Sequence, residues 1–176
     1  MGQQATRVAA IRHARSAQDI TLAQVLWVEY AQSLQVDLRF QGFAEELATL
    51  PGAYAPPRGR ILLAGPPGKA FGCIALRPFD VGSHGSGVAP ALHDDGSVAE
   101  VKRLYVQPSR RREGWGQQLA YALLDEARAI GYRELRLDTF EWMTGARVLY
   151  AALGFCEAPA YYDNPYAGAV YMSRTL

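Results

Sequence analysis

The segment 98–131 constrains this chain most strongly, because an extended apolar run there ends in a short basic turn that opens into an amphipathic helix. The turn carries Arg111, Arg112, Gly114 and Gly116. Glycines let backbone N–H groups approach an anion without a Cβ in the way, and the positive end of the following helix would face that anion. Arginines add charge and bidentate geometry. The pattern predicts a pyrophosphate site, and hence an enzyme with a phosphate-bearing cofactor rather than a binding module.

The size and charge of the chain limit the other classes of function. With 176 residues it suits one domain, 1–176, with its own hydrophobic core. A net charge of +1 gives no reason to expect a nucleic acid or a membrane surface as partner. No apolar run of about 18 residues predicts a membrane span, and the first residues do not resemble a secretory signal. We therefore expect a cytoplasmic protein.

The cysteines and histidines point to no metal or disulfide chemistry. Cys73 and Cys156 both lie in apolar runs, where buried reduced thiols are expected rather than a disulfide or a catalytic pair. His13, His84 and His93 have no metal-ligand spacing with one another or with the cysteines. We expect no metal site.

Strand and helix patterns alternate along the chain. Strands are expected at 7–12, 61–64, 71–76, 98–106 and 134–140, from 155 onward and at 169–172, and helices at 16–35, 43–50, 116–130 and 144–153. The stretch 65–68, Gly-Pro-Pro-Gly, is expected to be a hairpin turn and not a nucleotide loop, because its prolines lack N–H donors and Ala70 stands where Ser or Thr would bind magnesium. The polar stretch 80–96 is expected to be a surface loop. This order indicates a mixed α/β fold.

Two motifs in 98–155, about a third of the chain, resemble those of the GNAT superfamily of acyl-CoA-dependent N-acetyltransferases. The pattern Q/R-x-x-G-x-G/A is met by Arg111, Gly114 and Gly116, and a helical tyrosine shortly before Gly-Phe is met by Tyr150, Gly154 and Phe155. The resemblance implies a mixed, mostly antiparallel central sheet of about six to seven strands flanked by about four helices, with a splayed strand pair at the cofactor site.

The resemblance also implies acetyl-CoA as co-substrate. Backbone groups of Leu104, Tyr105 and Val106 would pair with its pantetheine arm as a strand would. The residues expected around its pyrophosphate are Arg111, Arg112, Glu113, Gly114, Trp115, Gly116 and Gln117. Arg112 would either reach the 3′-phosphate or lie in solvent. Two departures stand out: Glu113 is a carboxylate beside an anion site, and Met143 takes the place of an asparagine that touches the cofactor in many relatives.

Catalysis by attack of an amine on a thioester needs an acid and a base. The Tyr150 hydroxyl would protonate or stabilise the departing thiolate; the alternative is a core tyrosine. Glu100 would take the amine proton directly or through water, since on a regular strand it shares a face with Leu104 and Val106. A bulge would reverse that face, and a structural carboxylate is the alternative. His93 and Asp94 are further candidates for the base.

An aromatic wall is expected around the acceptor, formed by the first two helices and by the loop between the last strands. Its members are Trp27, Tyr30, Phe40, Phe43, Tyr162, Asn164 and Tyr166, each of which could also be an ordinary core or lid residue. We expect transfer of an acetyl group to the primary amine of a small molecule by direct attack in a ternary complex, in a monomer or homodimer. A longer acyl-CoA, a protein or peptide acceptor, and a non-catalytic CoA-binding domain are the alternatives.

Overall fold

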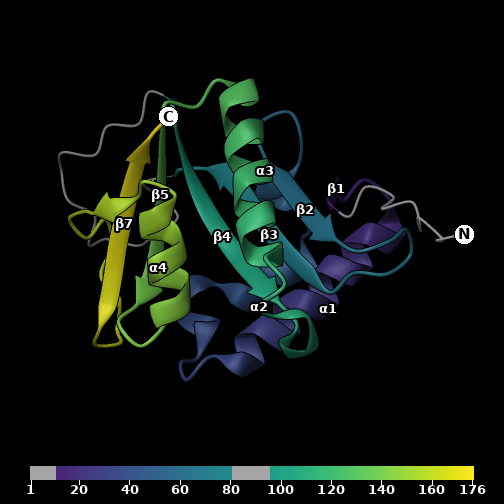
Figure 1. Ribbon diagram of the computed structural model, residues 1–176, viewed down its shortest axis with the longest axis horizontal. Helices are drawn as coiled ribbons and strands as arrows, with labels where there is room; N and C mark the ends of the chain where they lie inside the picture. Colours follow the sequence, from purple (N-terminus) through teal and green to yellow (C-terminus); the bar gives the residue numbers. More distant parts are fainter. Residues whose placement is uncertain (1–10, 81–95) are drawn as a thin grey trace, which may run out of the picture.

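The computed structural model describes residues 11–80 and 96–176, apart from the side chain of Phe40. A seven-stranded sheet forms its centre, with the strand order β1-β2-β3-β4-β5-β7-β6 (Figure 1). The strands are β1 (Ile11–His13), β2 (Arg60–Ala64), β3 (Gly72–Pro78), β4 (Val98–Val106), β5 (Glu134–Phe140), β6 (Cys156–Glu157) and β7 (Ala169–Thr175). Neighbouring strands are antiparallel except β4 and β5, which run parallel.

Helices cover both faces of this sheet. They are α1 (Ala17–Ser33), α2 (Phe43–Ala48), α3 (Trp115–Ile130) and α4 (Thr144–Ala152). Side chains of α3 and α4 pack on one face, and those of α1 and α2 pack on the other. The mixed, mostly antiparallel architecture confirms the expected fold class. Residues 7–10 of the expected first strand, and His84, His93 and Asp94 in the expected loop, lie outside the described residues.

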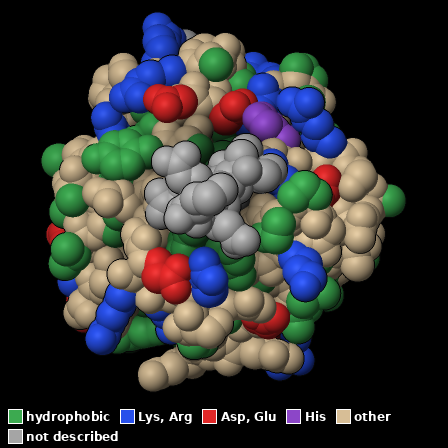
Figure 2. All heavy atoms as spheres, turned by 45° about the vertical axis from the view of Figure 1, so that its right-hand side comes forward, with side chains coloured by type: hydrophobic (Ala, Val, Ile, Leu, Met, Phe, Trp, Pro, Cys, Tyr) green, Lys and Arg blue, Asp and Glu red, His purple; other side chains and the backbone are tan. Residues whose placement is uncertain are grey.

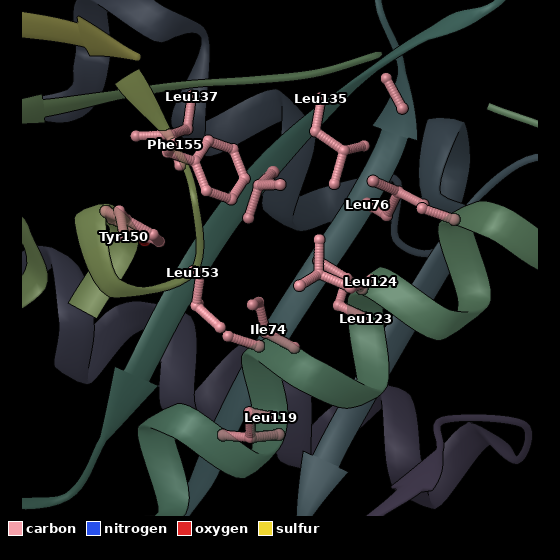
Figure 3. Close-up of a cluster of buried hydrophobic side chains, with 14 of the residues drawn as sticks. Ile74, Leu76, Leu119, Leu123, Leu124, Leu135, Leu137, Tyr150, Leu153 and Phe155 are labelled. Atoms are coloured by element: carbon pink, nitrogen blue, oxygen red, sulfur yellow. The ribbon is translucent and has the colours of Figure 1, made fainter. Parts of the chain in front are cut away.

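Local sequence signals set the helix ends. Ser16 caps α1 in a capping box with Asp19, in which each side chain accepts a hydrogen bond from the other residue's backbone N–H. Gly131 ends α3 in the left-handed conformation, with φ of 99°. Between its ends, α3 turns a stripe of buried apolar side chains to the sheet, where they meet Ile74 and Leu76 of β3 (Figure 3).

A β-bulge divides β4 into two halves. Tyr105 lies opposite Cys73 and Lys102 opposite Ala75, so two residues of β4 oppose one of β3. Arg103, within the bulge, has φ of 59°. Of the two alternatives for this strand, regular or bulged, the structure shows the bulged one. Glu100 does not share a face with Leu104 and Val106, which pack against the α3 side of the sheet.

The two cysteines differ in their surroundings. Cys73 is buried in β3, as expected, whereas Cys156 is exposed on β6. The expectation of two buried thiols is wrong for Cys156, because β6 is a two-residue strand at the edge of the sheet.

Basic and acidic side chains are interspersed on the face that Figure 2 shows. No described helix has the length and apolar character needed to cross a membrane.

Candidate active site

The parallel strands β4 and β5 separate soon after they begin. Val98–Glu100 pair with Glu134–Arg136, and the two strands share no further pairs along their described length. The edge of β4 from residue 102 to 106 therefore faces a gap instead of a neighbouring strand. This confirms the expected splayed pair, and an extended ligand chain can hydrogen-bond to such an edge.

The basic turn and α3 lie at the open end of this gap. Arg112 and Gly114 have φ of 65° and 83°, a backbone path that brings the chain sharply round into the helix. Gly114 is the N-cap of α3, and no described side chain caps the helix. The N–H groups of the first turn, at residues 115–117, therefore have no partner in the helix. The positive end of the helix dipole adds a partial positive charge at the same place. Together they form a site for an anion.

Neighbouring side chains leave this anion site open. The Glu113 carboxylate accepts hydrogen bonds from Trp115 Nε1 at 2.9 Å and pairs with Arg110 at 3.0 Å. Its charge is thereby partly offset, which answers the difficulty of a carboxylate beside an anion site. Arg111 donates from Nε to the carbonyl of Val106 at 2.9 Å. That bond ties the turn to the end of β4.

A narrow cavity runs from the gap between β4 and β5 toward α1. Its walls include Tyr30, Gln41, Lys102, Arg103, Asp138 and Tyr150. Tyr150 of α4 is 8% exposed and packs edge-on against Phe155 at 5.7 Å between ring centroids (Figure 3). No described group hydrogen-bonds its hydroxyl, and burial raises the pKa of that hydroxyl well above its usual value. Tyr150 thus lines the cavity as a protonated phenol with an uncommitted hydroxyl.

An ion pair crosses the gap where the strands part. Lys102 and Asp138 lie two residues beyond the last paired residues of β4 and β5, and Lys102 Nζ is 2.8 Å from Asp138 Oδ1. Asp138 Oδ2 accepts from the Tyr162 hydroxyl at 2.8 Å. Burial would raise the pKa of Asp138, but the Lys102 ammonium and these hydrogen bonds hold it below its usual value. The carboxylate is therefore ionised at the wall of the cavity.

Glu100 is fully buried and bound on all sides. It pairs with Arg77 Nη2 at 2.7 Å and Lys102 Nζ at 2.9 Å, and accepts from the Tyr161 hydroxyl at 3.0 Å. A carboxylate with two cationic partners is a weak proton acceptor. These contacts fit a residue that positions Lys102 better than one that takes a proton directly.

Arg103 lies under α1 and α2. Its guanidinium pairs with Glu46 and donates from Nη1 to Gln41 Oε1 at 3.3 Å. It also lies over the rings of Trp27 and Phe43, at 5.6 and 5.1 Å from their centroids. Burial would raise the pKa of Glu46, but the Arg103 charge lowers it. This second ion pair lies next to the first on the same face of the sheet.

Two loops meet over the acceptor side of the cavity. Gln41 of the short 3-10 helix η1 (Leu38–Gln41) donates from Nε2 to the Tyr162 hydroxyl at 3.1 Å. Asn164 donates to the same hydroxyl at 3.2 Å, and the Asp37 N–H donates to the Tyr166 hydroxyl at 3.1 Å. The segment before α2 and the loop between β6 and β7 are thus joined.

Of the residues expected around the acceptor, some line the cavity and others lie in the core behind it. Tyr30 lines the cavity, and burial raises the pKa of its hydroxyl to about 12. Trp27 is 0% exposed and packs on Tyr54, so it supports Arg103 from the core. Among the wall residues that sequence reasoning missed are Gln41, Lys102, Arg103 and Asp138. A signal existed for three of them, because Lys102, Arg103 and Asp138 are charged residues within predicted strands.

Comparisons with known proteins agree with this geometry. The model of the acetyltransferase (GNAT) family matches residues 21–155. An uncharacterised N-acetyltransferase of Schizosaccharomyces pombe is 35% identical over 156 residues, which span 88% of this chain and 87% of that protein. An aminoglycoside N(6′)-acetyltransferase of Klebsiella aerogenes is 29% identical over 134 residues, 74% of this chain and 82% of that protein.

A solved structure shares the fold. A protein of Salmonella typhimurium, solved with its cofactor acetyl-CoA, superposes with a TM-score of 0.65 at 19% identity and covers 94% of this chain and 92% of that one. The splayed strands and the open turn before α3 lie within or beside the matched residues. The protein described here is therefore an N-acetyltransferase and belongs to the GNAT family.

Proposed function

We propose that this enzyme transfers an acetyl group from acetyl-CoA to the primary amine of a small molecule, by direct attack in a ternary complex. The observation that carries the proposal is the alignment of three features along one gap: an anion site at the start of α3, a free edge of β4, and the Tyr150 hydroxyl in the cavity beyond. These match the diphosphate, the amide-bearing arm and the thioester end of one extended molecule.

The residues present fit that co-substrate. The N–H groups at 115–117 and the side chains of Arg111 and Arg112 would hold the diphosphate. Leu104, Tyr105 and Val106 would bond the arm through their backbone edge. Acetyl-CoA supplies the acetyl group as an activated thioester. Burial keeps the Tyr150 hydroxyl protonated at neutral pH, so that it would donate a hydrogen bond to the departing sulfur.

The joined loops favour a small acceptor over a peptide. A peptide needs an open groove on the acceptor side. The hydrogen bonds from Asp37 to Tyr166 and from Gln41 to Tyr162 instead hold two loops together across that side. Tyr30, Phe43, Tyr162 and Asn164 would line or support the acceptor pocket. The relative from Klebsiella aerogenes, named for an aminoglycoside, agrees with a small acceptor. The protein would act in the cytoplasm as a monomer or homodimer.

Acetyl-CoA turnover, measured as thiol release, tests the function. The panel of acceptors comprises amino acids, polyamines, aminoglycosides, arylalkylamines and peptides. We expect turnover with at least one small amine. Turnover with peptides alone would overturn the small-molecule acceptor. Stabilisation by acetyl-CoA without turnover on any amine would favour a binding domain.

A matched pair of glycine variants tests the anion site. Gly114 and Gly131 stand at opposite ends of α3, both with positive φ and both with space for a Cβ. Gly114→Asp places a negative charge at the anion site, and Gly131→Asp carries a similar backbone strain far from it. Acetyl-CoA at 100 times its Kd should stabilise the wild type and Gly131→Asp by about 2.7 kcal/mol in thermal unfolding. The stabilisation should vanish in Gly114→Asp, and equal stabilisation of both variants would contradict the assignment.

A further inference from the structure

The acceptor side of the cavity is bordered by a buried cluster of equal and opposite charges. Its cations are Arg77, Lys102 and Arg103, and its carboxylates are Glu46, Glu100 and Asp138. Uncompensated charge in such surroundings is unfavourable. A ligand of zero net charge leaves the balance intact, whereas a simple ammonium adds one positive charge without a counter-ion.

The Arg103 guanidinium has hydrogen-bond donors left for a ligand. It is 5% exposed and lines the cavity, yet among the described residues only two of its three nitrogens have partners, Nη1 on Gln41 and Nη2 on Glu46. Its Nε is buried, and no group in 11–80 or 96–176 forms a hydrogen bond with it. Its backbone holds a φ of 59°, which is costly for a residue with a Cβ and is typical of functional sites. A guanidinium with spare donors is a good partner for a carboxylate.

Gln41 joins Arg103 to the opposite wall. Its amide oxygen accepts from Arg103 Nη1 at 3.3 Å, and its amide nitrogen donates to Asp138 Oδ2 at 3.3 Å. One small polar group thus offers an oxygen to the cation and an N–H to the carboxylate. An α-amino acid offers the same two groups, a carboxylate oxygen and an ammonium N–H, at a similar separation. Gly42, directly after Gln41, has φ of 68°, a backbone conformation that favours glycine.

We infer that the acceptor is an amine that also carries a carboxylate, of the α-amino acid class, with its carboxylate on Arg103 and its amine at Asp138; this rests on the proposed function. In the reaction, the ammonium held at Asp138 first loses one proton to bulk water, and the freed nitrogen lone pair forms the amide bond to the acetyl carbon. The C–S bond of acetyl-CoA breaks, and the second amine proton reaches the departing thiolate through the Tyr150 hydroxyl, which gives its own proton to the sulfur and takes the amine proton in its place. The zwitterion adds no net charge to the cluster when it binds.

Matched acceptors test this without altering the protein. Each L-amino acid is compared with its carboxamide and with the amine that lacks the carboxyl group, by kcat/KM for thiol release. We expect at least one amino acid to exceed both analogues by about 10-fold or more, since a site built for a polar group rejects analogues that lack it. Equal or better turnover of the analogues would overturn the inference and leave the proposed function intact. Absence of turnover on every amine would instead overturn the proposed function.

Two arginine variants identify the residue responsible. Arg103→Lys keeps the charge but loses the planar fork, and should reduce the preference for the acid over its carboxamide by about 10-fold or more. Arg60→Lys is the control, because Arg60 is a partly buried arginine that pairs with Glu126 away from the cavity. A purely structural role for Arg103 would lower kcat/KM for both acceptors equally and leave their ratio unchanged, which would overturn the assignment.

Discussion

The two faces of β4 are built on opposite principles. Ala99 and Val101 join an apolar cluster beneath α3 and α4, whereas Glu100 and Lys102, alternating with them, face charged partners on the other side. On the first face, stability comes from apolar area removed from water and is graded by side-chain size. On the second, each buried charge depends on a specific partner. One short strand therefore separates the part of the protein that holds the fold from the part that faces the acceptor.

The largest expected effects are on the free energy of unfolding, and the faces should differ in how much side-chain volume must be removed to produce them. Lys102→Met nearly conserves volume but leaves Asp138 without its ion-pair partner and Glu100 with one fewer, so it should destabilise the protein by about 3–5 kcal/mol. Leu123→Ala, on the apolar face, has to remove more side-chain volume to cost a comparable amount, about 2–5 kcal/mol. Urea unfolding of both variants measures the two values. A Lys102→Met variant as stable as the wild type would contradict the view that the charged face depends on pairing.

A smaller effect should distinguish the faces by their response to acid. The pKa of Asp138 is held below its usual value in the folded protein. Its stabilising contribution is therefore complete above the unfolded pKa of about 3.9 and is lost as the pH falls toward the folded pKa. Urea unfolding between about pH 6 and pH 2 should show a shallower loss of stability in Asp138→Asn than in the wild type.

The exposed Asp125 of α3 provides the control for this acid response. Its side chain is 81% exposed, and Asp125→Asn should keep the wild-type slope. Equal slopes for Asp138→Asn and the wild type would mean that the Lys102–Asp138 pair does not stabilise the folded state.

The apolar face could be predicted from sequence, and the charged face could not. The helical spacing of Leu119, Leu123 and Leu124 predicted the buried stripe of α3, because a 3.6-residue period fixes which side chains face the sheet. The turn at 111–116 was also found locally, since its glycines and arginines are neighbours in the chain.

The acceptor side depends on contacts between distant residues. Arg103 meets Gln41 across 62 positions, and Gln41 meets Asp138 across 97. No local sequence pattern predicts contacts between residues so far apart in the chain. The sequence also left open whether β4 is regular or bulged, and the bulge at Arg103 gives Glu100 the opposite face from a regular strand, because a single extra residue shifts the period-two alternation. The charged residues Lys102, Arg103 and Asp138 within predicted strands were the signal in the sequence. They indicated where the site lies but not which residues contact one another.

The most direct test of the account compares two buried tyrosines that differ in what their hydroxyls do. The Tyr132 hydroxyl donates to the Arg58 carbonyl at 2.9 Å, whereas no described group bonds the Tyr150 hydroxyl, which belongs to the cavity wall. Tyr132→Phe should lose about 1 kcal/mol of stability and keep its kcat. Tyr150→Phe should keep its stability and its affinity for acetyl-CoA, but lose about 10- to 1,000-fold in kcat. Wild-type turnover in Tyr150→Phe would contradict the proposed role and make Tyr150 a packing residue.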